Sequence, residues 1–249
     1  MVCETFHQGN SIIHRLDPRV RIVVAIAFSL VIAVSRRFPA VGAGLALGLL
    51  LALAARLPLV ATLKRLIPLN LFMLVLLAVL PLTTPGSVLV QVGPLSASKA
   101  GLLLAAAVTV KGNAILLCLT ALLATMEIVT LGHALGHLWV PEKLTHLLLF
   151  TVRYLDLLHH EYSRLAGAMK VRCFRARMNA HTYRTVAWLV GMLLVRSLDR
   201  SERIVAAMKC RGFRGRFYVL EHFAFAGRDA AFGALSLLVL LALIWVEHS

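Results

Sequence analysis

The sequence predicts an all-α polytopic membrane protein with about five transmembrane helices and a membrane-proximal module of amphipathic helices. Hydrophobic residues make up 60% of its 249 positions and charged residues 15%, whereas soluble globular domains average about 45–50% and about 25%. Lysine and arginine outnumber aspartate and glutamate by 26 to 11, which gives a net charge of +15. This combination argues against a disordered tail, a secreted disulfide-rich scaffold and a soluble DNA-binding domain.

Five segments are apolar enough to be membrane spans, since a helix needs about 20 residues to cross a hydrocarbon core of about 30 Å. They are residues 22–35, 38–55, 66–82, 100–125 and 230–246. The first is short, but the arginines that flank it can extend to the interface. Gly44 and Gly48 form a GxxxG pattern, which permits close helix approach and also arises by chance. Residues 83–86 are typical of a turn, and the alternation in 88–95 predicts a short strand or a surface loop.

Lys111 lies near the middle of the fourth predicted span, where an ammonium group is costly. We expect it to extend to the interface or to contact another helix. A direct place in a polar pathway through the membrane is the alternative.

The positive-inside rule orients the spans, because basic residues of short loops stay on the cytoplasmic side. With a cytoplasmic N-terminus, the short inner segments carry six basic residues and the outer ones three. These are Arg15, Arg19, Arg21, Arg56, Lys64 and Arg65 inside, and Arg36, Arg37 and Lys99 outside. The chain therefore divides into N-terminal spans in 1–125, a cytoplasmic segment in 126–228 and a C-terminal span in 229–249.

The cytoplasmic segment 126–228 contains 16 of the 26 basic residues and is too charged to be a succession of spans. Apolar side chains recur there every three or four residues, which predicts two amphipathic helices. The first begins at Pro141 and Glu142, since proline and an acid suit a first helical turn. The second runs from about Tyr183 to Met208.

The two amphipathic helices end in the same way. Residues 164–174 repeat in residues 203–213, an offset of 39. The matching residues are Arg164 and Arg203, Ala168-Met169-Lys170 and Ala207-Met208-Lys209, Arg172 and Arg211, and Phe174 and Phe213. Gly212 suits a left-handed helix cap and Cys173 suits it less well. Cations near a helix C-terminus or a lipid surface explain Lys170 and Lys209. They do not explain a repeated order of residues, so we expect two equivalent docking points for a symmetric partner.

The chain resembles the transmembrane T component of energy-coupling factor (ECF) importers, of the CbiQ/NikQ type. The resemblance covers most of the chain and includes Leu16-Asp17-Pro18-Arg19, Pro141, Arg153-Tyr154, Glu161 and Arg164. Its most specific elements are Val171-Arg172-Cys173 and Cys210-Arg211-Gly212, which correspond to two Ala-Arg-Gly signatures. Val171 and Cys210 replace alanine here, and Cys173 replaces glycine.

The resemblance implies crossed coupling helices whose ends dock into an ABC-type ATPase dimer of the CbiO/NikO kind. It implies a CbiM/NikM-like substrate-specificity (S) subunit and an accessory small membrane subunit as further partners. The location is then the bacterial inner (plasma) membrane, and the cargo a transition-metal ion, cobalt before nickel. The ATPase-docking residues are Arg172, Arg211, Val171, Cys173, Cys210 and Gly212. The supporting residues are Ala168, Lys170, Ala207, Lys209, Arg153, Glu161 and Arg164.

We expect no catalytic residues, no cofactor and no metal site in this chain. His133 and His137, and the pair His159 and His160, lack clustered acidic or cysteine ligands. No GxxxxGK[ST] loop is present to bind phosphates. A conventional ABC permease subunit and a membrane-embedded lipid-modifying enzyme are the alternatives; a nucleic-acid binder would leave the apolar spans without a purpose.

Overall fold

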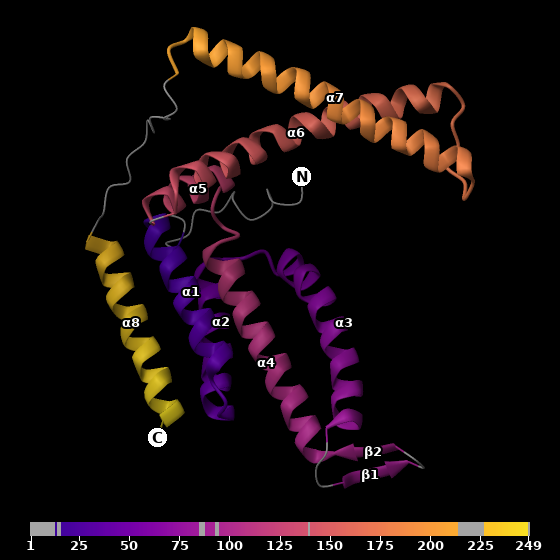
Figure 1. Ribbon diagram of the computed structural model, residues 1–249. Coiled ribbons are helices and arrows are strands. Elements are labelled where there is room, and N and C mark those ends of the chain that lie inside the picture. Colours follow the sequence, from indigo (N-terminus) through magenta and orange to yellow (C-terminus); the bar gives the residue numbers. More distant parts are fainter. Residues whose placement is uncertain are drawn as a thin grey trace. The chain divides into compact units, whose positions relative to one another are not determined.

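In the part of the chain that the structure describes, the secondary structure consists of helices and one short β-hairpin (Figure 1). The computed structural model describes residues 13, 16–84, 88–92, 95–138, 140–213 and 227–248. It forms two compact units, Met1–Leu138 with Phe223–Ser249, and Trp139–His222. The first unit contains α1 (Pro18–Val34), α2 (Phe38–Ala54), α3 (Leu59–Thr83), β1 (Val88–Val92), β2 (Leu95–Ser98), α4 (Lys99–Leu122), α5 (Ile128–His137) and α8 (Gly227–His248). The second contains α6 (Glu142–Val171) and α7 (Ala180–Cys210).

The first unit is a helical bundle organised around α4. This helix packs against α1, α2 and α3, while α8 packs against α1 and α2. The core between them is formed by fully buried apolar side chains such as Phe28, Ile32 and Leu122. The short helix α5, which the sequence analysis did not separate from its surroundings, packs against α1.

Three of the described helices are long and apolar enough to cross a membrane: α3, α4 and α8. Helices α1 and α2 have 17 residues each, which is about 25 Å at 1.5 Å per residue. Helix α3 begins at Leu59 instead of residue 66, so Lys64 and Arg65 lie in its second turn. The membrane character of the unit is thus clear, and the count of five spans stays a prediction.

The glycines of α2 mark close approaches to two different helices. A Cβ added at Gly48 would lie 3.0 Å from the backbone oxygen of Ala114 in α4. A Cβ added at Gly44 would overlap Ile32 of α1. The GxxxG pattern therefore serves two neighbours of α2 at once, because its two glycines face different helices.

Helices α1 and α8 run parallel, and both of their ends are tied together. Asp17 caps α1 by accepting a bond from the backbone N–H of Arg19 at 2.9 Å. The backbone N–H of Asp17 donates to Asp229 at the start of α8 over 2.8 Å. At the other end the backbone N–H of Arg36 donates to Glu247 over 2.7 Å. If both helices cross the membrane, they cross it in the same direction, as the predicted topology requires.

Polar side chains inside the bundle join helices to one another. Arg21 is buried and donates to the carbonyl of Leu122 over 2.6 Å and to Thr125. It therefore covers the C-terminus of α4. Lys111 makes an interhelical contact, because its Nζ donates to the carbonyl of Ala33 over 3.1 Å.

Two asparagines connect α3 to α4 by reciprocal hydrogen bonds. Asn70 donates to Asn113 over 3.2 Å, and Asn113 donates back over 2.9 Å. Such bonds favour association of apolar helices, because an amide that faces lipid alone would lack partners.

The segment between α3 and α4 contains the antiparallel hairpin of β1 and β2. Val92 pairs with Leu95 next to the turn, and Val88 pairs with Ser98 at the open end. Of the two alternatives for residues 88–95, the structure thus has the strand.

Candidate functional site

The repeated segments end α6 and α7 with the same backbone geometry. In the first copy the N–H of Phe174 donates to the carbonyl of Met169 over 3.1 Å, and that of Cys173 to Lys170 over 3.0 Å. In the second copy the corresponding bonds, from Phe213 to Met208 and from Gly212 to Lys209, are both 3.0 Å. This pair of bonds defines a Schellman motif. Residues 164–174 and 203–213 therefore form the same local structure.

The residue after each signature arginine adopts a left-handed conformation. Its φ is +59° at Cys173 and +78° at Gly212. Glycine reaches this region without steric cost, whereas a residue with a Cβ pays about 1–2 kcal/mol. The first helix end thus keeps the geometry of the second in spite of its less suitable residue.

The pattern of exposure is also shared by the two ends. Arg172 and Arg211, the C-cap residues, are exposed. The methionine and phenylalanine that the Schellman bonds join are half-buried in both copies. Exposed residues also include Val171, Cys173, Cys210, Gly212, Ala168, Lys170, Ala207 and Lys209. Each end therefore presents its signature arginine on a turn that is closed by its own backbone bonds.

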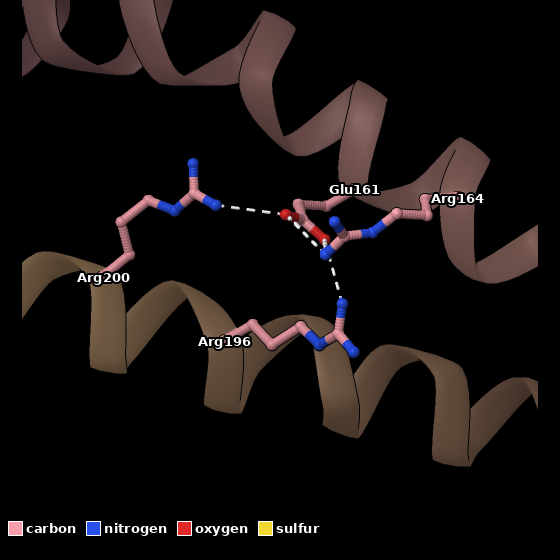
Figure 2. A network of polar contacts seen from close by, with 4 residues as sticks. All are labelled: Glu161, Arg164, Arg196 and Arg200. Atoms are coloured by element: carbon pink, nitrogen blue, oxygen red, sulfur yellow. Dashed lines mark hydrogen bonds and ion pairs between the residues drawn. The ribbon is translucent and has the colours of Figure 1, made fainter.

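Helices α6 and α7 cross where Glu161 meets three arginines (Figure 2). Its carboxylate accepts from Arg164 of its own helix at 2.8 Å and from Arg196 and Arg200 of α7 at 3.1 Å each. The Glu161 side chain is 14% exposed, and that of Arg164 is 68% exposed. Arg153 is exposed and is not among the three arginines that pair with Glu161.

The arginines set the charge state of Glu161. Partial burial alone would raise the pKa of this carboxyl group. The hydrogen bond from Arg196 and the positive charges of the three arginines outweigh burial, and they hold the pKa of Glu161 below its usual value. The carboxylate is therefore ionised near neutral pH, and the network of one acid and three bases keeps a net positive charge.

Two hollows adjoin these features within the second unit. The first, of about 430 Å³, is lined mainly by apolar residues of both helices, with Glu161, Arg196 and Arg200 at its polar side. The second, of about 500 Å³, surrounds the first signature and contains Arg172, Arg175 and Arg177. Four arginines at these hollows were not predicted as site residues from the sequence: Arg175, Arg177, Arg196 and Arg200. Arg175 and Arg177 could have been found by extending the repeat, because arginines stand 39 positions further on at 214 and 216.

In the described ranges no three His, Cys, Asp or Glu side chains gather at one place. His159 and His160 are exposed on α6. His160 lies 3.6 Å from Asp156, a contact between residues one turn apart.

These features define a helical membrane protein with an apolar bundle in one unit and a pair of equivalent, arginine-bearing helix ends in the other. Comparison with known proteins gives the family: the model for the cobalt transport protein CbiQ matches residues 9–219. The chain belongs to this family of transporter membrane components, which are non-catalytic subunits.

Named relatives are of two kinds. The energy-coupling factor transporter transmembrane protein EcfT of Listeria innocua serovar 6a is 27% identical over 226 residues, which cover 86% of this chain and 85% of that protein. The EcfT of Leuconostoc gelidum subsp. gasicomitatum is 28% identical over 84% of this chain and 82% of its own length. The cobalt transport protein CbiQ of Rhodobacter capsulatus is 31% identical over 58% of this chain and 61% of its own length. The chain is accordingly a transmembrane T component of the ECF type.

Proposed function

We propose that this T component links a cytoplasmic ABC-type ATPase dimer to a substrate-binding S subunit, and that Arg172 and Arg211 are its two ATPase-docking residues. The observation that carries the proposal is the pair of identical Schellman turns, each with one exposed C-cap arginine. Two equal docking points suit a partner that has two equal sockets, as a dimer does. A guanidinium group presents five donors in a fixed arrangement, so each turn can be recognised by a matching set of acceptors.

The proposed mechanism transmits a change of the ATPase dimer through α6 and α7. When ATP binding brings the two ATPase subunits together, the sockets approach each other and carry the two helix ends with them. The helices then rotate as rigid bodies, and the motion reaches the membrane bundle and the S subunit. Hydrolysis takes place on the partner, and this chain supplies the mechanical connection.

We assign cobalt as the transported ion, with nickel as the second candidate, on the name of the matching family and of the Rhodobacter relative. The ion is cargo and is expected to bind to the S subunit. A small accessory membrane subunit is expected as a further member of the complex. We place the protein in the bacterial inner membrane with the N-terminus and residues 126–228 in the cytoplasm. Residues 1–125 and 229–249 are then the membrane-spanning parts.

The docking role is tested by replacing both arginines in the complete complex. Arg172→Ala together with Arg211→Ala is expected to abolish co-purification of the ATPase and radiolabelled cobalt uptake, since both docking points lose their charge. Lys143→Ala with Arg184→Ala is the matched control, because it removes two exposed positive charges of α6 and α7 outside the repeat. The proposal would be disproved if the variant with both replacements still bound the ATPase and supported normal uptake.

A further inference from the structure

The contact between α6 and α7 is centred on two residues that hold the same position in the two repeats. The offset of 39 that aligns Arg172 with Arg211 also aligns Glu161 with Arg200. These last two side chains are in direct contact, with 3.1 Å between the guanidinium nitrogen and the carboxylate oxygen. Equivalent residues of a two-fold arrangement contact each other at its axis. Glu161 and Arg200 therefore mark a local pseudo-two-fold axis between the helices.

This axis lies equally far along each helix from the exposed arginine. Eleven positions separate Glu161 from Arg172, and eleven separate Arg200 from Arg211. At 1.5 Å per residue each distance is about 16 Å of helix. A rotation of one helix against the other about this point displaces both arginines by similar amounts.

The contact between α6 and α7 depends on the charge of one residue at the crossing. Glu161 supplies the negative charge of the network in Figure 2, and the other three members are arginines. Without that charge, guanidinium groups of both helices would face one another across the contact, and like charges at this separation repel. Isolated exposed ion pairs contribute little, but a shielded carboxylate shared by three partners holds a network together.

The two α7 partners of Glu161 lie one helical turn apart. Arg196 and Arg200 are four residues apart, so their side chains emerge from the same face of α7. A carboxylate between them can strengthen its bond to one while the other lengthens. The ion pair can therefore persist while the angle between the helices changes.

We propose that Glu161 is a positioning residue for coupling: its ion pairs with Arg196 and Arg200 form the pivot of α6 and α7 and set the separation of Arg172 and Arg211. The importance of that separation rests on the proposed function. The existence of the pivot does not, because it depends on the geometry of α6 and α7 alone.

The pivot is tested by a distance measurement on the full chain in lipid nanodiscs. Cys173 and Cys210 are exposed and adjoin the two signature arginines, so they accept spin labels once Cys3 and Cys118 are replaced by alanine. Pulsed electron paramagnetic resonance is expected to give one narrow distribution of distances between the labels on Cys173 and Cys210. Glu161→Gln is expected to broaden it by about one helical turn, roughly 5 Å. Glu202→Gln, which removes an exposed carboxylate from α7, is the control and leaves the width unchanged.

Coupling is measured in the complete, unlabelled complex as cobalt imported per ATP hydrolysed. Glu161→Gln is expected to keep the ATPase bound and to lower this ratio at least about fivefold, the lower end of typical coupling effects. The exchange Glu161→Arg with Arg200→Glu restores one acid among three arginines with the pair reversed across the axis. It is expected to recover both the narrow distance distribution and the ratio of cobalt imported to ATP hydrolysed. If Glu161→Gln acted by misfolding the protein, the exchange would recover neither quantity.

An unchanged distribution in Glu161→Gln overturns the pivot, and a broadened distribution with normal coupling overturns the proposed role of Glu161 in coupling. Failure of the exchange to restore either quantity also overturns it. These results are separate from those of the docking test: if the chain without Arg172 and Arg211 still bound the ATPase, the distance measurement would decide on the pivot by itself.

Discussion

At the scale of single residues, the two helix ends differ most at the position after the signature arginine. Cys173 and Gly212 adopt the same left-handed conformation. Among the described residues other than its two chain neighbours, none has an atom within 4 Å of a Cβ added at Gly212. The difference that the described part of the chain shows between the two residues is therefore one of backbone conformation. The first end should therefore open more readily than the second.

Replacing Cys173 by glycine is expected to stabilise the end of α6 by up to about 1 kcal/mol, because the Cβ penalty disappears. The reverse change, Gly212→Cys, should weaken the end of α7 by a similar amount. Hydrogen–deuterium exchange of the Phe174 and Phe213 amides reports both, since each amide is protected by a Schellman bond. A change of 1 kcal/mol is about a fivefold difference in protection. Equal exchange in all three proteins would show that the left-handed residue does not limit either turn.

At the scale of elements, the described bundle is held by close backbone approaches as well as by apolar burial. Gly48 of α2 faces the backbone of Ala114 in α4, whereas a Cβ at Gly42 of the same helix would meet nothing within 4 Å. Small residues at such positions let helices pack in lipid, where the hydrophobic effect does not drive them together.

Gly48→Leu is expected to destabilise the protein by about 1–3 kcal/mol, because a side chain must displace α4. Gly42→Leu is the matched control and should be close to neutral, since its side chain has open space. Thermal unfolding in detergent measures the difference as a fall of several degrees in Tm for Gly48→Leu. Similar Tm values for the two variants would mean that α2 and α4 separate without cost.

The elements themselves were largely predictable from the sequence, and their contacts were not. Apolar runs and helical periodicity gave the helices, but the charged residues at the start of α3 masked its first two turns. Arg21 is buried against Leu122 and Thr125, a contact that no sequence pattern indicated. That outcome depends on which helix end lies next to it in space, which periodicity does not encode. The Asn70–Asn113 pair was not predicted either, because periodicity does not show which residues of two helices lie next to each other.

The candidate site was more accessible to sequence reasoning because its information is local. A repeated order of residues predicted two equal helix ends, and a Schellman turn needs only six successive residues. The role of Glu161 at the crossing required the structure, although the repeat offset of 39 already pairs it with a residue of opposite charge.

At the scale of the whole molecule, orientation in the membrane follows from how charge is distributed over the ends of the first unit. The starts of α1 and α8 are joined through Asp17 and Asp229, and the α1–α2 turn is joined to the end of α8 through Glu247. On the positive-inside rule, the basic residues Arg19, Arg21 and Arg228 near the first of these ends favour the proposal that it is the cytoplasmic one.

This orientation predicts opposite accessibility for Arg37 and for the signature cysteines. In a chain that lacks Cys3 and Cys118, a membrane-impermeant maleimide is expected to label Arg37→Cys in intact cells, because the α1–α2 turn is exposed and external. Native Cys173 and Cys210, which are also exposed, should react only after the membrane is permeabilised. A chain without any cysteine controls for background labelling. Labelling of Cys173 in intact cells, with Arg37→Cys protected, would place the signature arginines outside the cell, where no ATPase could meet them.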